Sequence, residues 1–365
     1  MTSTTARSPG AAPARARRRP GVPAVCAALV LALLGLLVLS ASVGTVAVSP
    51  GDAARLITGH LVPGAPWMRD GSLSPLQDQA VWRFRLPRAL LAATAGAGLA
   101  LAGAIMQAVV RNPLAEPYIL GVSSAAGMGA VLVIVLGSAA VAGLTVHTAA
   151  FAAAVAASAL VAVLAQKRGT LAPTRMILTG VALGSLFSAV TSYLTITTEA
   201  QNVYSVLFFL LGSVSAATMG SLAAPAAALA VAAVVVAVNA RGMNALMSGE
   251  ESATALGVRV VRLRLVLLVT ASLLTGAVVS VAGGIGFVGL VVPHVARILV
   301  GGDHRRLLPI AVLGGAAFLM LADLLARTVA APTEVPIGII TAFVGAPFFL
   351  WLMRRDGAAQ AGLDR

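Results

Sequence analysis

The chain has 365 residues, of which 59% are hydrophobic and only 10% are charged. Soluble globular domains carry about 25% charged residues, so this composition excludes an ordinary soluble protein and indicates an integral membrane protein. The formal net charge of +13 does not indicate nucleic-acid binding, because the arginines stand in short clusters between apolar runs with few aromatic residues among them.

The first 22 residues are polar and rich in proline and arginine, which predicts a disordered, basic, cytoplasmic N-terminus. The apolar stretch from Val22 to Val48 is longer than the roughly 7–15 residues of a signal-peptide core, so we expect an uncleaved first span. The single cysteine, Cys26, lies in this stretch. One thiol excludes an internal disulfide framework or a zinc cluster.

Ten transmembrane spans are predicted between residues 23 and 355, followed by a cytoplasmic tail at 356–365. Their ranges are 23–48, 88–110, 117–137, 143–165, 174–197, 221–239, 262–281, 285–301, 307–330 and 336–353, with a shorter apolar stretch at 203–216. The predicted fold class is therefore an all-α integral membrane protein. The excess of arginine in alternate loops places both termini in the cytoplasm.

Some arginines break this positive-inside pattern because they share the long outer loop before the second span: Arg55, Arg69, Arg83, Arg85 and Arg88. Arg327 lies at the outer end of the ninth span, four residues after Asp323, with which it is predicted to pair. Arginines at a water-exposed rim can bind carboxylates through two hydrogen bonds. The alternative is ordinary snorkelling to lipid headgroups.

Small residues recur every four positions in the second span, at Ala92, Gly96, Ala100 and Ala104, and the fifth span contains Gly180 and Gly184. Such faces allow helix backbones to approach closely in a membrane. The alternative is that the pattern only reflects an alanine-rich chain.

Two segments prevent a continuous helix: 111–117, with two prolines, and the glycine-rich 283–289. Irregular backbone at membrane depth must be buried in protein or line water. These segments and the residues that follow them supply the pathway or gate candidates Asn112, Pro113, Gly286, Pro293 and His294.

The segment 244–258 is too polar to span and is predicted to form a short helix on the cytoplasmic face. Ser248 and Glu251 have the spacing of a capping box, Glu250 joins Glu251 in the first turn, and Gly257 provides a stop. This helix is either an attachment point for a partner or a plain interfacial helix.

The sequence contains no G-x-x-x-x-G-K-[ST], H-E-x-x-H or G-x-S-x-G motif. We therefore expect no enzymatic activity and no bound cofactor or metal in this chain.

Several segments, in order, resemble the FecCD family of ABC-importer permeases. They are RLPR at 85–88, GAGLALAGAIMQAVVRNPLAEPYILGVSSAAG at 96–127, GEESATALGV at 249–258, GGIGFVGLVVPHVARILVGGDHR at 283–305, LADLLAR at 321–327 and EVPIGIITAFVGAPFFLWLMRR at 334–355. The chain departs from the family at Gly284, where proline is frequent, and at Phe209 and Met219, which occupy positions that are often tryptophan.

The resemblance implies a type II ABC-importer permease fold in the bacterial cell membrane. It also implies a second permease copy, identical or a sister chain, two separate ATPase subunits that bind ATP and Mg²⁺, and an extracytoplasmic substrate-binding protein. Segment 244–258 would then hold the ATPase-coupling helix, with Gly249, Glu250, Glu251, Ala253, Leu256 and Gly257. The outer arginines Arg85, Arg88 and Arg327 would pair with glutamates of the binding protein.

The function expected from this resemblance is import of ferric siderophores by alternating access, with haem and cobalamin as alternative cargoes. A different class, an ion-coupled secondary transporter, would use intramembrane carboxylates and would make Asp323 a proton site. The capped helix at 249–257 argues against that class.

Overall fold

The computed structural model describes residues 21–167 and 170–361, so the predicted disordered N-terminus lies almost entirely outside the described residues. The described part is helical apart from one antiparallel strand pair, β1 (Gln166–Lys167) and β2 (Thr170–Leu171). The α-helices are α1 (Val22–Ser42), α2 (Pro50–Leu61), α3 (Pro75–Gln79), α4 (Leu86–Val110), α5 (Val122–Leu136), α6 (Val146–Ala165), α7 (Pro173–Thr197), α8 (Ala200–Leu211), α9 (Ala223–Met247), α10 (Glu250–Ala255), α11 (Val260–Ala282), α12 (Val288–Val300), α13 (His304–Ala326) and α14 (Ile337–Ala361).

Eight helices of the described part are long and apolar enough to cross a membrane: α1, α4, α6, α7, α9, α11, α13 and α14. Together with the shorter apolar helices α5 and α12, they correspond to the ten predicted spans. The partial helix predicted at 203–216 is α8. The all-α membrane fold is therefore confirmed.

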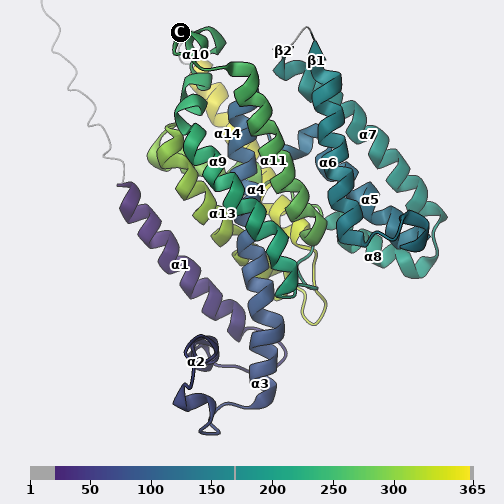
Figure 1. Cartoon of the computed structure of the whole chain (residues 1–365). Helices are drawn as coiled ribbons and strands as arrows, with labels where there is room; N and C mark the ends of the chain where they lie inside the picture. Colours follow the sequence, from purple (N-terminus) through teal and green to yellow (C-terminus); the bar gives the residue numbers. More distant parts are fainter. Residues whose placement is uncertain (1–20, 168–169, 362–365) are drawn as a thin grey trace, which may run out of the picture.

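Helix α4 is the central element, with α11, α12, α13 and α9 packed around it (Figure 1). Of its apolar stretch, 83% is buried within this one chain. Gly96 faces the backbone carbonyl of Gly315 in α13, and Gly103 faces the backbone of Gly289 in α12. A methyl group at either position would overlap that backbone, which confirms the close packing predicted for this helix.

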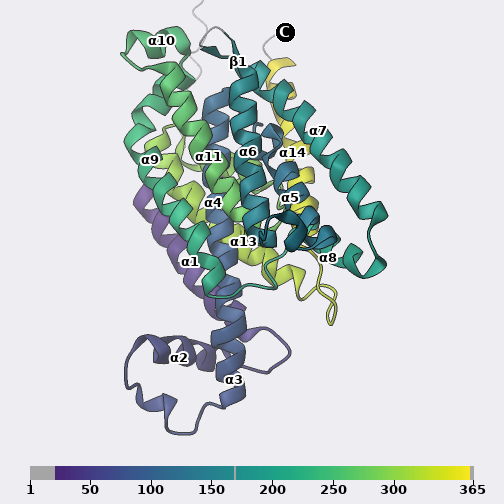
Figure 2. The same ribbon diagram turned by 45° about the vertical axis from the view of Figure 1, so that its right-hand side comes forward.

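Helices α5, α6 and α7 form a second group beside this centre, as Figure 2 shows. The glycines predicted to pack closely in α7 do so: Gly180 lies against the backbone of Leu120, and Gly184 lies against Gly121. Gly121 has a left-handed φ of 71°, which lets the chain turn into α5 at this contact.

The two ends of the bundle differ in what they carry. Helix α10, the strand pair and the end of α14 lie together at one end, which we call the α10 end (Figures 1 and 2). Helices α2 and α3 project from the opposite end, called here the α2 end.

Both predicted interruptions are irregular backbone held by protein contacts. The Tyr118 hydroxyl donates to the carbonyl oxygen of Ile285 (2.6 Å) and accepts from the Ile285 amide (2.8 Å). The Gly284 amide donates to the carbonyl oxygen of Phe209 (3.2 Å). Proline, frequent in the family at this position, has no N–H to make that bond.

One boundary prediction is wrong. Helix α9 continues to Met247, and α10 begins after Gly249 with no side-chain cap, so the Ser248–Glu251 capping box does not form. Gly249 adopts a left-handed φ of 111°, which turns the chain sharply between the two helices and leaves Ser248 at the end of α9. Helix α14 runs to Ala361, but its membrane-spanning part ends at Arg354, before the predicted start of the tail at 356.

Candidate functional site

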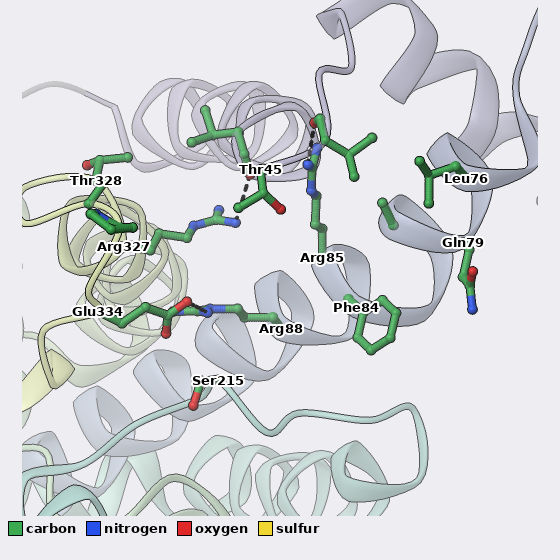
Figure 3. A pocket seen from close by; sticks show the side chains of 16 residues that line it. Thr45, Leu76, Gln79, Phe84, Arg85, Arg88, Ser215, Arg327, Thr328 and Glu334 are labelled. Atoms are coloured by element: carbon green, nitrogen blue, oxygen red, sulfur yellow. Dashed lines mark hydrogen bonds and ion pairs between the residues drawn. The ribbon is translucent and has the colours of Figure 1, made fainter.

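The three arginines predicted to bind a partner converge at the α2 end. Arg85 closes a π-helical turn before α4, Arg88 stands in the first turn of α4, and Arg327 follows the last residue of α13. They share the wall of an open cavity of about 760 Å³ with Glu334 and Ser215. Figure 3 shows the arginines and Glu334 reaching this space from different elements.

Arg85 is a buried anchor rather than a water-exposed rim group, with a relative exposure of 7%. Its guanidinium donates to the carbonyl oxygens of Ala41 (2.9 Å), Ser42 (2.8 Å) and Val46. The chain leaving α1 therefore wraps around this side chain. Sequence analysis missed this burial because those acceptors lie about 40 residues away in the chain.

Arg88 holds two carboxylates that are distant from it in the sequence. Its Nε lies 2.8 Å from Oδ1 of Asp323, and its Nη1 lies 2.7 Å from Oε1 of Glu334. Asp323 is fully buried, whereas 38% of the Glu334 side chain is exposed. The Arg88 side chain is thus held by one buried carboxylate, Asp323, and one partly exposed carboxylate, Glu334.

Arg327 completes the cluster. Its Nε lies 3.7 Å from Oδ2 of Asp323, so the predicted pairing of these two residues within α13 is confirmed. Its terminal nitrogens donate to the carbonyl oxygens of Val43 (3.2 Å) and Ser40 (2.9 Å). Three guanidinium groups therefore meet two carboxylates, which leaves one positive charge in excess at the cavity.

At the α10 end, the residues predicted for coupling form a small exposed helix. Ala253 is fully buried and seats the helix, whereas Leu256 is 73% exposed and Glu251 is also exposed. Gly257 has a left-handed φ of 79°, and its amide donates to the carbonyl oxygen of Thr254 (2.9 Å), so the predicted stop is confirmed.

Glu250 is the member of this helix that reaches the body of the protein. Its Oε1 lies 2.8 Å from Nη2 of Arg264 in α11 and 3.8 Å from Nη2 of Arg111, the residue that ends α4. The side chain of Arg264 is 3% exposed. Sequence analysis did not identify either arginine as a partner, although Arg264 lies only a short distance beyond the coupling segment.

A second connection joins the end of α9 to the turn before α13. The side-chain amide of Asn244 donates to Oδ1 of Asp303 (2.7 Å), and its carbonyl oxygen accepts from the His304 amide (2.9 Å). The Asn244 hydrogen bond holds the pKa of the Asp303 carboxyl below its usual value. The end of α9, just before α10, is therefore attached to the turn that precedes α13.

The five gate candidates do not form one site. Asn112 and Pro113 are exposed in the turn after α4, whereas Pro293 is buried inside α12. His294 makes an edge contact with Phe348 of α14, with ring centroids 6.1 Å apart. Gly286 lies in the linker before α12, near the ring of Tyr118. Their assignment to a pathway stays a prediction.

Comparison with known proteins gives this geometry its context. The model of the FecCD transport family matches residues 31–355. The chain belongs to this family. The FecCD permease is 42% identical to a cobalamin import system permease of Halobacterium salinarum, over 88% of this chain and 93% of that one. It is 39% identical to a hemin transport system permease of Yersinia pestis, over 78% of this chain and 87% of that protein.

A solved structure supports the same assignment. The FecCD permease superposes on a metal-chelate type ABC transporter, described as inward-facing, with a TM-score of 0.79 and 32% sequence identity. The match covers 91% of this chain and 99% of the solved one. The protein is thus the membrane permease component of an ABC importer.

Proposed function

We propose that this permease carries its cargo by alternating access, powered by two separate ABC ATPase subunits docked at the α10 end. The observation that carries the proposal is the presence of distinct contact surfaces at opposite ends of one helical bundle. Helix α10 presents exposed Glu251 and Leu256 at one end, and the arginine cavity opens at the other. The sequence has no phosphate-binding loop of its own, which agrees with a separate motor.

The α10 end is proposed to face the cytoplasm. Arg259, Arg262, Arg305 and Arg306 flank α10 and the turn between α12 and α13. This clustering agrees with the positive-inside rule, by which both termini would lie in the cytoplasm. The α2 end would then face the extracytoplasmic binding protein, with the positive cavity steering its approach. A second copy of this permease, or a sister chain, would complete the pathway in the cell membrane.

The cargo is proposed to be a large metal chelate, with ferric siderophores as the first candidate. The metal-chelate description of the solved relative supports this class. Cobalamin is a second candidate, because the Halobacterium relative named for cobalamin matches 88% of this chain. Haem is the third, from the Yersinia relative.

The decisive experiment uses proteoliposomes that contain the permease, its partner ATPase and its binding protein. Ferrichrome, cyanocobalamin and haemin are offered in turn, with ATP or with a non-hydrolysable analogue inside the vesicles. ATP-dependent uptake of one chelate supports the proposal and identifies the cargo. Uptake that persists without the ATPase and follows an imposed proton gradient would instead establish a secondary transporter.

A further inference from the structure

Helix α10 is attached to the rest of the protein in an unusual way. It has only six residues, and the backbone adopts left-handed φ values just before and just after it, at Gly249 and Gly257. Glycine tolerates a wide range of φ and ψ angles, so these two positions allow the helix to reorient. Ala253 is its one buried residue. The backbone and the apolar contacts therefore fix the orientation of α10 only weakly.

The carboxylate of Glu250 supplies an ionic connection. One oxygen lies 2.8 Å from the Arg264 guanidinium and 3.8 Å from that of Arg111. The Arg264 side chain is 3% exposed and that of Glu250 is 46% exposed, so the pair is shielded from water on the arginine side only. Opposite charges at these distances attract each other, so the ion pairs favour the orientation of α10 that keeps Glu250 beside both arginines.

The two arginines belong to the elements that form the centre of the bundle. Arg264 stands in the second turn of α11, and Arg111 ends α4 in a left-handed conformation with φ of 55°. That conformation is uncommon for a residue other than glycine. Helices α4 and α11 pack against each other along the middle of the molecule. One carboxylate on α10 therefore contacts both central helices.

We propose that Glu250 is the positioning residue through which movement of α10 is transmitted to α4 and α11. The proposal rests on the proposed function, in which the ATPase moves α10. Glu250 would then act through Arg264 and Arg111 rather than by contacting ATP or cargo. Its neighbour Glu251 is exposed and has no ion pair in the described part of the chain, so the two acids differ in role despite their adjacency.

The test compares Glu250→Gln with the matched control Glu199→Gln, at an exposed acid outside α10, in the full importer. Both substitutions keep side-chain size and remove one negative charge. We expect Glu250→Gln to retain ATPase association and basal hydrolysis. Stimulation of hydrolysis by the binding protein should fall by at least about fivefold, because coupling energies of this kind correspond to such factors. Glu199→Gln should leave stimulation unchanged.

A charge exchange separates transmission from a merely structural role. The double variant Glu250→Arg with Arg264→Glu restores an opposite-charge pair and should recover part of the stimulation that Glu250→Arg alone loses. Normal stimulation in Glu250→Gln would overturn the inference, as would loss of ATPase association in that variant. Failure of the unmodified permease to bind an ATPase would overturn the proposed function itself. This outcome is distinguishable from failure of the inference, because it needs no variant.

Discussion

Glu334 is the accessible member of the arginine cluster, and its position suggests competition with an incoming partner. Its carboxylate forms an ion pair with Nη1 of Arg88 at 2.7 Å, while the buried Asp323 pairs with Nε of the same arginine. Reversing Arg88 to Glu would bring a third carboxylate to the fully buried Asp323. Breaking a buried pair costs about 3–5 kcal/mol, so that variant would report on folding rather than docking. Glu334 offers a milder substitution.

We predict that Glu334→Gln strengthens association of the binding protein. The substitution frees one side of Arg88 for a partner carboxylate and raises the positive excess at the cavity. An exposed pair contributes about 0–1 kcal/mol, so affinity should rise up to about fivefold, more at low salt than at high salt. Surface plasmon resonance at two salt concentrations measures this. The exposed Glu199→Gln is the control, and weaker binding by Glu334→Gln alone would contradict the prediction.

Tyr118 is a residue whose importance only the structure reveals. Its hydroxyl satisfies both the amide and the carbonyl of Ile285 in the unwound segment before α12. Tyr118→Phe would leave two partly buried backbone groups without that partner. We predict a loss of about 1–3 kcal/mol in unfolding free energy. Thermal unfolding in detergent checks this against Tyr204→Phe, an exposed position on α8 that should change little.

At the scale of elements, the sequence predicts which segments are helical better than how they end. In the described part of the chain, apolar runs located the eight helices that could cross a membrane and the three shorter apolar helices, and the four-residue spacing of Asp323 and Arg327 identified a local ion pair. The capping box predicted at Ser248 does not form. Gly249, with its positive φ, is the residue before α10, and no side chain caps this helix. A short sequence motif therefore predicts a helix cap only where the backbone conformation of the adjacent residue allows the cap to form.

Contacts between distant elements could not be predicted in the same way. Arg88 and Glu334 are separated by 246 positions, and Arg85 is buried by the chain that leaves α1. The motif at 85–88 identified these arginines as noteworthy, but a motif carries no information on solvent exposure. Their expected position at a water-exposed rim was therefore only partly right, since they line an open cavity yet are themselves largely buried.

The contact between α4 and α12 yields a prediction at this scale. A methyl group on Gly103 would overlap the backbone of Gly289, whereas one on Gly35 in α1 would meet no atom within 4 Å. Forcing extra volume into a packed interface costs about 1–3 kcal/mol. Gly103→Ala should therefore lower the unfolding temperature, and Gly35→Ala should be neutral or slightly stabilising. Equal unfolding temperatures for the two variants would show that α4 and α12 can separate freely.

For the whole molecule, α4 links the two proposed contact surfaces. Arg88 lies in its first turn within the arginine cluster, and Arg111 ends it beside Glu250. Between these ends the helix is buried along most of its length. Because α4 is one continuous, packed helix, a displacement at its Arg111 end would also move its Arg88 end.

Such a link makes the two binding equilibria reciprocal. If a non-hydrolysable ATP analogue on the ATPase changes the affinity of the permease for its binding protein by some factor, the binding protein must change the affinity for the analogue by the same factor. We predict a factor of at least about five, measured by equilibrium binding to the full complex in nanodiscs. In Glu250→Gln the factor should approach one, whether it is measured on the affinity for the binding protein or on the affinity for the ATP analogue. The reason is that α10 loses its carboxylate contact with Arg111 and Arg264. An unchanged factor in that variant would mean that another route, such as the Asn244–Asp303 connection, carries the coupling between the two ends.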